Sequence, residues 1–436
     1  MKCAVVGNSV ASLVALDLLR QNHENEVTWI QEGSLPSGVW RGIQFNGQTI
    51  DLGMMNFEVD LPNNCRVDSL HSYDLFSINS CANFVRQVSE YLESKVELTE
   101  LPKIKIFSDG GYFSDFIISN DLTDLAKYLE PTNQDREFKS DVSLTHPSKK
   151  YELIGYEDFE SSFDSYAERM YPPSFHEKVL HRWGSRLLGE MYRELQTTRH
   201  RSGWLPLYYP ETLMEAVIDG TSLKPYSFHY PRMGSISKMW VDLSMELNCD
   251  EVVVKENLVD FNKKEDLADF EHIIWGSSRQ QFNRVFQPAS PDVINFKRGK
   301  IDLDYYLIPE AGFEYCTLNL SSGLDSWYRS TLSPNYQDSL GNQLLCVESK
   351  SSPSASQAEP TRTVTNLSLE AKDKVIEFKG IPVFSVPTDD EIEESQSSIL
   401  DLIKNYKRIS FVGPALMPFA QTMNDQIIQG MKASNE

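Results

Sequence analysis

The sequence predicts an α/β fold in which both ends of the chain contribute to one domain. At the start, the short apolar run Lys2 to Val6 breaks at Gly7 into a segment of helical periodicity, which is typical of a buried parallel strand followed by a helix. Near the finish, the run Ile409 to Val412 ends at Gly413, and a closing helix follows. We interpret the two units as halves of one binding site. A site split in this way implies a large ligand.

The first turn is suited to binding a phosphate group. It directs the free amides of a helix N-terminus beyond the strand end, where these donors and the helix dipole stabilise a pyrophosphate. Ser9 and Ser12 stand at the second and third glycine positions of the dinucleotide-binding pattern, so only Gly7 remains. Taken alone, this turn is equally typical of any α/β protein that opens on a strand, a turn and a helix.

A second strand supports the nucleotide interpretation. The run Glu26 to Ile30 is followed by Glu32, about 25 residues after Gly7. In the dinucleotide-binding fold, an acidic residue at this distance accepts hydrogen bonds from the adenosine ribose hydroxyls. Glu32 is therefore expected to mark the ribose position.

Length, charge and cysteine spacing limit the classes of function. A chain of 436 residues with 40% hydrophobic residues is longer than most single cores, so we expect two domains. The net charge of −22 argues against nucleic acid, which requires a basic surface. No apolar stretch approaches the roughly 20 residues that span a bilayer. The six scattered cysteines disfavour zinc sites and disulfides. We expect a cytoplasmic protein with no metal, membrane or nucleic acid partner.

The middle of the chain predicts elements of both domains. Asn46-Gly47 between two short apolar runs is typical of a β-hairpin. Helical patterns cover 80–96, 175–195 and 236–247. Strands of the first sheet are expected at 251–255, 258–261 and 272–276, and strands of a second sheet at 301–307, 344–349 and 375–378. We predict a nucleotide domain from 1–75, 222–288 and 380–436, and a substrate domain from 76–221 and 289–379.

In this order, the segments resemble the FAD-dependent amine oxidase-like superfamily, and within it the branch of UDP-galactopyranose mutase and protoporphyrinogen oxidase-like proteins. Four places carry the resemblance: Val5 to Ser12 with Glu32; Gly38 to Gly42 with Asp51-Leu52-Gly53; Tyr230 to Gly234 with the strand pair and Ile273-Ile274-Trp275; and Gly380 to Phe384 through Gly413 to Gly430. The resemblance implies a discontinuous, Rossmann-like FAD-binding domain with an inserted mixed helical and antiparallel β substrate domain.

The resemblance also implies FAD as the cofactor. In this superfamily the last helix directs its N-terminus at the ribityl chain and the pyrimidine edge of the flavin, and here Asn424 or Asp425 is placed to cap it. Its dipole would favour negative charge on the reduced ring. The alternative is a helix that only packs on the sheet. The expected cofactor-binding residues are Gly7, Ser9, Val10, Ala11, Ser12, Glu32, Gly38, Trp40, Arg41, Gly53, Met54, Met55, Val259, Gly413, Asn424, Asp425 and Ile427.

Two positions depart from the family pattern. Pro414 follows the last-strand glycine, where an acidic residue often bonds the ribityl chain. Galactopyranose mutases carry a histidine shortly after the glycine that corresponds to Gly53, whereas this chain has Met54 and Met55, which argues against the mutase reaction. The two methionines would either line the ring or fill gaps in the core, and core packing is the commoner role of such a pair.

Candidates for the substrate side come from a basic and an aromatic segment. Arg182 and Arg201 lie in the clearest basic stretch and could hold a diphosphate, and the alternative is a solvated helix face paired with Glu190 and Glu194. Tyr209 and Tyr230 could stack on a sugar or a nucleobase, and the alternative is packing between domains. No catalytic residue is identified, because His71 and His229 are proton carriers by chemistry alone.

The resemblance implies an FAD-dependent oxidoreductase acting on a sugar or sugar nucleotide in bacterial surface polysaccharide biosynthesis. The partners are then a small-molecule substrate, such as a nucleotide sugar, and a candidate nicotinamide electron donor. Two alternatives remain. The first is a flavin-dependent sugar-nucleotide mutase without net redox change. The second is a non-catalytic binding protein derived from the fold, which would explain the missing glycines and Pro414.

Overall fold

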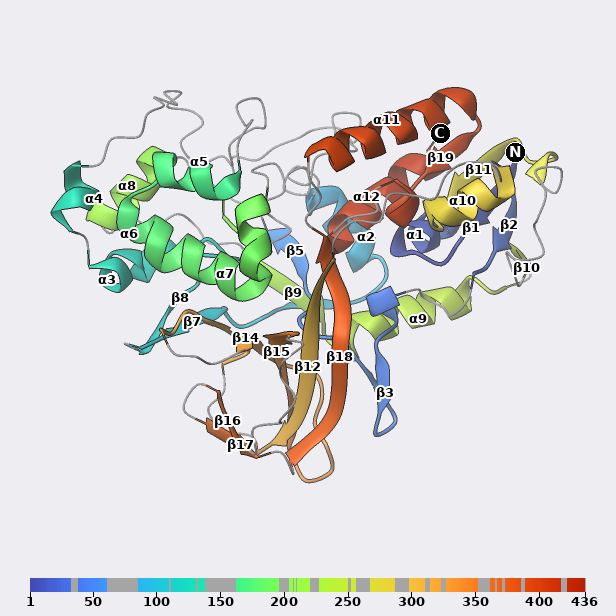
Figure 1. Cartoon of the computed structure of the whole chain (residues 1–436). Coiled ribbons are helices and arrows are strands. Elements are labelled where there is room, and N and C mark those ends of the chain that lie inside the picture. The colour runs from blue at the N-terminus through green and yellow to red at the C-terminus, as the bar shows by residue number, and fades with distance from the viewer. Residues whose placement is uncertain are drawn as a thin grey trace.

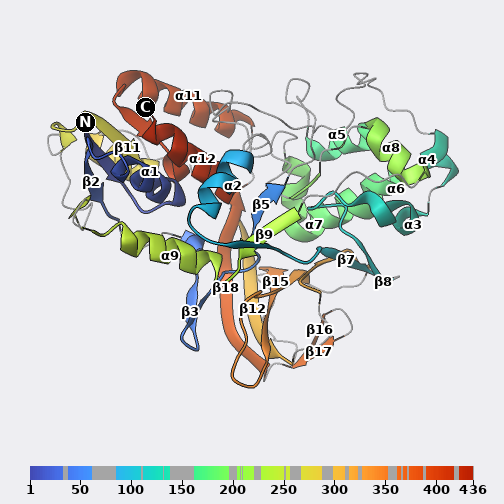
Figure 2. The same ribbon diagram turned by 180° about the vertical axis from the view of Figure 1, so that it is seen from behind.

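The computed structural model has three parts around a common centre (Figure 1). An α/β part carries both chain termini, a helical part lies on the opposite side, and a large mixed sheet extends away from both, as Figure 2 shows from behind. The structure describes residues 1–32, 38–60, 85–109, 111–130, 132–137, 162–195, 204–206, 208, 210–219, 227–249, 252–255, 267–286, 298–309, 314–322, 327–351, 361–364, 367–370, 373–385, 389–416 and 422–435.

The α/β part is built on a five-stranded parallel sheet with strand order β10-β2-β1-β11-β19. Its strands are β1 (Lys2–Val6), β2 (Glu26–Ile30), β10 (Val252–Lys255), β11 (His272–Trp275) and β19 (Ile409–Phe411). β11 pairs with β1 on one side and with β19 on the other, so the first and last strands of the chain end at the same edge of one sheet. The predicted meeting of the two chain ends is therefore observed. The predicted strand at 258–261 lies outside the described residues.

Helices cover both faces of this sheet, which explains why its central strands read as continuous apolar runs. Cys3 and Val5 belong to the hydrophobic cluster that includes α1 and α12, whereas Ala4 and Val6 belong to the cluster that includes α10 and α11. This alternation is the two-residue period of a strand buried on both sides. The four helices are α1 (Val10–Arg20), α10 (Arg279–Phe286), α11 (Asp389–Asn405) and α12 (Met423–Ser434).

The predicted second sheet is present and has seven strands in the order β18-β12-β15-β14-β13-β7-β8. Neighbouring strands are antiparallel except β13 and β7, which are parallel, so the sheet is mixed. Its strands are β7 (Lys105–Ser108), β8 (Gly111–Ser114), β12 (Arg298–Ile308), β13 (Cys316–Asn319), β14 (Trp327–Leu332), β15 (Gln343–Lys350) and β18 (Lys374–Ser385), with a separate hairpin of β16 (Thr361–Val364) and β17 (Leu367–Glu370).

The helical part lies over the β14 and β15 side of this sheet (Figure 1). Its helices are α3 (Leu125–Leu129), α4 (Asn133–Glu137), α5 (Phe163–Met170), α6 (Pro173–Phe175), α7 (Arg182–Leu188) and α8 (Pro210–Asp219). The helical pattern predicted over 175–195 is observed, as consecutive segments of different helix type. A π-helical segment, His176–His181, precedes α7, and Gly189, with φ of +63°, ends it before a 3₁₀ segment, Gly189–Glu194.

Short elements connect the three parts. The described part of the predicted helix at 80–96 is α2 (Val85–Glu93), and the helix predicted at 236–247 is α9 (Ile236–Glu246). The predicted Asn-Gly hairpin joins β3 (Ile43–Phe45) to β4 (Gln48–Ile50), with positive φ at both turn residues. β5 (Phe57–Asp60), β9 (Ser227–Pro231) and β6 (Leu98–Glu100) form a small sheet at the centre. No helix in the described part of the chain is long and apolar enough to cross a membrane.

Candidate functional site

The carboxyl edge of the parallel sheet begins at the turn between β1 and α1. Gly7 has φ of +100°, and a Cβ atom there would lie 2.7 Å from the Ser277 amide nitrogen, so both conformation and space require glycine. Ser9 is the N-cap of α1, and its hydroxyl oxygen accepts a hydrogen bond from the Ser12 amide at 3.2 Å. The two serine hydroxyls lie 2.9 Å apart and are buried. Val10 and Ala11, between them, are fully buried.

Glu32 lies between the ends of β2 and β11. Its backbone oxygen accepts from Nδ2 of Asn8 at 2.5 Å, and the Ser277 hydroxyl donates to its carboxylate. The side chain is only half-buried. One carboxylate oxygen is therefore oriented by the protein at the edge where the sequence predicts a ribose.

At the other end of the chain, Gly413 has φ of +55° and begins the turn after β19. Its amide donates to Oε1 of Gln429 on α12 at 2.7 Å. Arg279, on α10, donates to the backbone oxygens of Ala415 at 2.6 Å and Leu416 at 2.8 Å, and burial lowers the pKa of this arginine to about 10. The Gly413 turn is thus held by hydrogen bonds from two helices.

The N-cap of α12 is Thr422, which corrects the prediction that Asn424 or Asp425 caps this helix. Thr422 and Asp425 form a capping box, in which the Asp425 carboxylate accepts from the Thr422 amide at 3.0 Å and the Thr422 hydroxyl at 2.8 Å. Asp425 therefore acts within the cap as the third helical residue. Asn424 and Ile427 are buried in the first turns of α12.

A segment from Asp51 to Met55 joins the α/β part to the large sheet. Asp51 sits at the N-terminus of α9, where its carboxylate accepts from the amides of Ser237 at 2.8 Å and Ile236 at 3.3 Å, and from the Tyr230 hydroxyl at 2.5 Å. Burial raises the pKa of Asp51, and these hydrogen bonds oppose that shift. Tyr230, a predicted substrate residue, is therefore a partner of Asp51.

Met54 and Met55 are both buried, each 7% exposed. The Cys316 thiol donates to Sδ of Met54 at 3.3 Å, and the Ser237 hydroxyl approaches Sδ of Met55 at 3.8 Å. Gly53 donates its amide to the Tyr305 hydroxyl at 2.9 Å. These contacts agree with the core-packing alternative for the two methionines.

The large sheet places an ion pair against this segment that sequence reasoning missed. Arg329 on β14 and Glu348 on β15 form a bidentate pair with distances of 2.8 and 2.7 Å. Glu348 also accepts from the Tyr328 hydroxyl at 2.8 Å and from the Met54 amide at 3.2 Å. The two charged side chains are 8% and 1% exposed, so the pair is a buried one. A charged residue within an otherwise apolar strand is the signal that could have predicted it.

Two aromatic residues border the ion pair. The Arg329 guanidinium lies 4.5 Å from the centre of the Trp204 ring, and Trp204 is half-buried with φ of +54°, a rare conformation for a bulky residue. Tyr315 is 5% exposed, and its hydroxyl makes no hydrogen bond within the described residues. Burial raises the pKa of Tyr315 well above its usual range, so it remains a hydrogen-bond donor.

The other predicted residues are dispersed. Arg182 donates to the backbone oxygen of Leu320 at 2.8 Å, which ties α7 to the loop after β13. Gly38, Trp40 and Arg41 form one 3₁₀ turn beside α9, with Trp40 half-buried and Arg41 exposed. Val259, Arg201 and Tyr209 lie outside the described residues.

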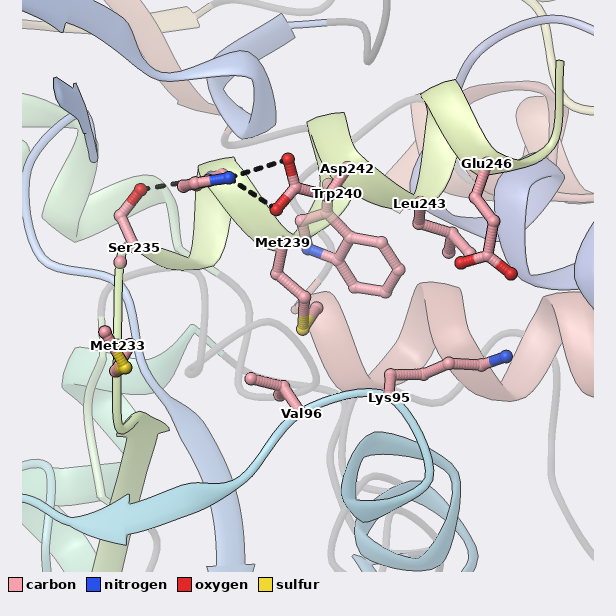
Figure 3. Close-up of a pocket in the computed structure, with 11 residues that line it drawn as sticks. Lys95, Val96, Met233, Ser235, Met239, Trp240, Asp242, Leu243 and Glu246 are labelled. Carbon is pink, nitrogen blue, oxygen red and sulfur yellow. Dashed lines mark hydrogen bonds and ion pairs between the residues drawn. The ribbon is translucent and has the colours of Figure 1, made fainter. Parts of the chain in front are cut away.

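A separate pocket of about 350 Å³ lies between α9 and the segment that carries Lys95 and Val96 (Figure 3). Trp240 forms its inner wall, and the indole N–H of Trp240 contacts Sδ of Met423, the first residue of α12, at 3.4 Å. The charged side chains of this pocket have ion-pair partners: Lys238 with Asp242, Lys95 with Asp17, and Glu246 with Arg20. We therefore treat the pocket as separate from the site at the sheet edge.

The whole chain resembles several solved structures. It matches a reduced UDP-galactopyranose mutase with a TM-score of 0.65 and 11% identity, covering 100% of this chain and 94% of that one. It matches a putrescine oxidase variant with a TM-score of 0.56 and 11% identity, covering 100% and 98%. It matches a protein from Exiguobacterium sp. 255-15 named as a protoporphyrinogen oxidase with a TM-score of 0.57 and 14% identity, covering 100% and 98%.

The chain has the fold that these solved structures share. This finding confirms the resemblance inferred from the sequence. No protein-family model matches the chain, and no curated protein matches it in sequence. We define the polar cluster of the large sheet as Tyr315, Tyr328, Arg329 and Glu348. In this fold, the Asp51 to Met55 segment joins the parallel sheet to this buried polar cluster.

Proposed function

We propose that this protein is an FAD-dependent oxidoreductase that acts on a sugar or sugar nucleotide. The observation that carries the proposal is that Glu32, after β2, and Gly413, after β19, both lie at the carboxyl ends of the strands of one parallel sheet. Ligands of open α/β sheets bind outside the carboxyl ends of the strands. An elongated dinucleotide is long enough to contact both the turn after β2 and the turn after β19.

Buried amide groups support a polar ligand along this edge. Among the buried side-chain amide atoms that have no hydrogen-bond partner within the described residues are Gln31 Nε2, Asn56 Nδ2, Gln426 Oε1 and Gln429 Nε2. Gln31 follows β2, Asn56 precedes β5, and the other two lie on α12, which contacts β5. Buried polar groups in native proteins are almost always paired, so unpaired ones call for a missing partner. A hydroxyl-rich chain such as the ribityl group of FAD could both accept from amide nitrogens of this kind and donate to the amide oxygen.

The chain's own residues divide the work of holding FAD. Glu32 would accept hydrogen bonds from the ribose hydroxyls, and the α1 N-terminus would donate to the pyrophosphate. Asn424 would face the ribityl chain, because the carboxylate of Asp425 is engaged by Thr422 in the capping box. The α12 N-terminus would stabilise negative charge on the ring. Bound FAD would supply two-electron redox chemistry.

The polar cluster supports an uncharged, hydroxyl-bearing substrate. Arg329 and Glu348 neutralise each other, so the cluster offers no unpaired carboxylate to a cationic amine. Tyr315 offers a hydroxyl donor, and Trp204 offers an aromatic face stacked on Arg329. Sugars are bound by such combinations of hydroxyl donors and aromatic rings. We place the substrate between this cluster and the flavin, in the proposed substrate domain of 76–221 and 289–379.

A flavin-dependent sugar-nucleotide mutase is the second candidate, because the galactopyranose mutase matches with a TM-score of 0.65. The methionines after Gly53 argue against it, since the mutases carry a histidine there. The two reactions differ in their electron balance. A mutase turns over without net change in flavin oxidation state, whereas an oxidoreductase consumes a donor or an acceptor in proportion to product. A role in surface polysaccharide synthesis would follow from either reaction.

The absorption spectrum of the purified protein tests the proposal. We expect flavin absorbance in the protein as isolated, or after incubation with FAD and removal of the excess. Bleaching by a nicotinamide donor that depends on a nucleotide sugar would support the oxidoreductase. Protein that remains colourless after incubation with FAD would overturn the proposal and favour a non-catalytic binding protein.

A further inference from the structure

The two serines that replace glycines in the first turn each face a glycine on another segment. A Cβ atom on Gly276, directly after β11, would lie 2.0 Å from Oγ of Ser12 and 2.8 Å from Oγ of Ser9. The backbone of Gly276 lies outside the left-handed region, so alanine could adopt its conformation. Space alone therefore requires glycine at this position.

Gly413 meets Ser9 in the same way. A Cβ atom on Gly413 would lie 2.9 Å from Oγ and 3.1 Å from Cβ of Ser9. The hydroxyl of Ser9 is thus directed inward, between α1 and the turn that follows β19. The side chain of Ser9 is 2% exposed, in agreement with this orientation.

We propose that Gly276 and Gly413 are residues of the diphosphate-binding turn, which this chain assembles from three segments. This inference rests on the proposed binding of FAD. The third glycine of the usual pattern permits close packing of helix and strand, and here the missing Cβ is on the strand side, at Gly276. The second glycine of the usual pattern permits close approach of the pyrophosphate. Here Ser9 stands at that position, and its side chain packs against Gly413, so the outer side of the turn presents only backbone atoms to the ligand.

A double-mutant cycle between Ser12 and Gly276 tests the inference. The variants are Gly276→Ala, Ser12→Ala and the double variant, measured by the thermal unfolding midpoint without added FAD and by the Kd for FAD from quenching of flavin fluorescence. We expect Gly276→Ala to lower the midpoint and weaken FAD binding by about tenfold or more, because its methyl group overlaps the Ser12 hydroxyl. In the Ser12→Ala background, the same change should alter both quantities less, because only the longer contacts of the added Cβ remain.

Ser9→Ala provides the matched control background. It removes the 2.8 Å contact and leaves the 2.0 Å contact, so it should rescue Gly276→Ala less than Ser12→Ala does. If Gly276→Ala does not fold, recovery of folded protein by Ser12→Ala is the supporting result. Equal losses in all three backgrounds, or unfolded protein in all of them, would overturn the inference.

The same data separate this inference from the proposed function. Absence of FAD binding by the unaltered protein would overturn the proposed function. FAD binding that does not change across the cycle, while the unfolding midpoint does, would leave FAD as the cofactor and overturn only the assignment of Gly276 to its binding turn.

Discussion

Glu348 accepts hydrogen bonds from the side chains of Arg329 and Tyr328 and from the backbone amide of Met54. This one carboxylate therefore connects the large sheet to the Asp51 to Met55 segment. Removing a carboxylate from water is costly, and the cost is offset only when its oxygens are fully paired. Glu348 meets this condition with four donors. The residue is therefore expected to position Met54 as well as to balance Arg329.

Glu348→Gln should lower the free energy of unfolding by about 3–5 kcal/mol, because it leaves Arg329 as a buried, unbalanced charge. Chemical denaturation measures this loss. The double variant Arg329→Met/Glu348→Gln removes both charges and keeps an acceptor for the Met54 amide, so it should recover most of the stability. If the double variant is as unstable as the single one, charge balance is not the reason for the pair.

Asp51 predicts a pH dependence of stability. Burial raises its pKa above the ordinary value of 3.8, so the folded protein binds this proton more tightly than the unfolded chain does. The stabilising contribution is fully present below pH 3.8 and is lost as the pH rises through the folded-state pKa. The unfolding free energy of the unaltered protein should therefore fall, relative to that of Asp51→Asn, as the pH rises. Denaturation at several pH values measures the difference, and a difference that grows in the opposite direction would contradict this sign.

At the scale of helices and strands, the elements that the sequence predicted best are those buried on both faces. The strands β1, β2, β11 and β19 were predictable because continuous apolar runs bounded by turn residues are characteristic of strands covered on both faces. The helical pattern at 175–195 was also predictable, but apolar periodicity did not reveal its π-helical segment or the positive φ at Gly189, where α7 ends. The capping box of α12 was visible as Thr422 three residues before Asp425, and was missed.

The packing of α12 on α1 depends on Gly430. A Cβ atom there would lie 2.5 Å from the backbone oxygen of Ala11 and 2.8 Å from Cβ of Val14. Alanine favours a helix over glycine by about 0.5–1 kcal/mol, whereas overpacking costs about 1–3 kcal/mol. The clash involves a backbone atom that cannot rotate away, so Gly430→Ala should destabilise the protein by about 1–2 kcal/mol net. Thermal unfolding checks the sign, and a stabilised variant would show that the two helices can separate freely.

At the scale of the whole molecule, the two halves of the candidate site differ in how far the sequence could predict them. The cofactor half depends on local patterns at Gly7, Glu32 and Gly413, each readable within its own strand, turn and helix. The polar cluster of the proposed substrate half could not be predicted, because Arg329 and Glu348 lie on different strands and are paired only through the register of the large sheet. Periodicity describes which face a residue occupies, but it does not identify the partner opposite.

A cofactor held by both chain ends should stabilise the molecule more than its separate parts do. ADP would contact the N-terminal half at Glu32, and riboflavin the C-terminal half at Asn424. Joining the two makes the second contact intramolecular, so FAD should bind more tightly than either fragment and raise the unfolding midpoint more than both fragments added together. At a concentration of 100 times its Kd, FAD should stabilise the protein by about 2.7 kcal/mol.

Glu32→Gln separates the two halves in the same measurement. This variant should weaken stabilisation by ADP and by FAD, because the ribose hydroxyls lose a charged acceptor, and should leave stabilisation by riboflavin unchanged. Unfolding midpoints recorded across a concentration series of each ligand check both expectations. If ADP and riboflavin together match FAD, the two chain ends bind independent ligands, and the sheet edge would then hold two small sites in place of one elongated site.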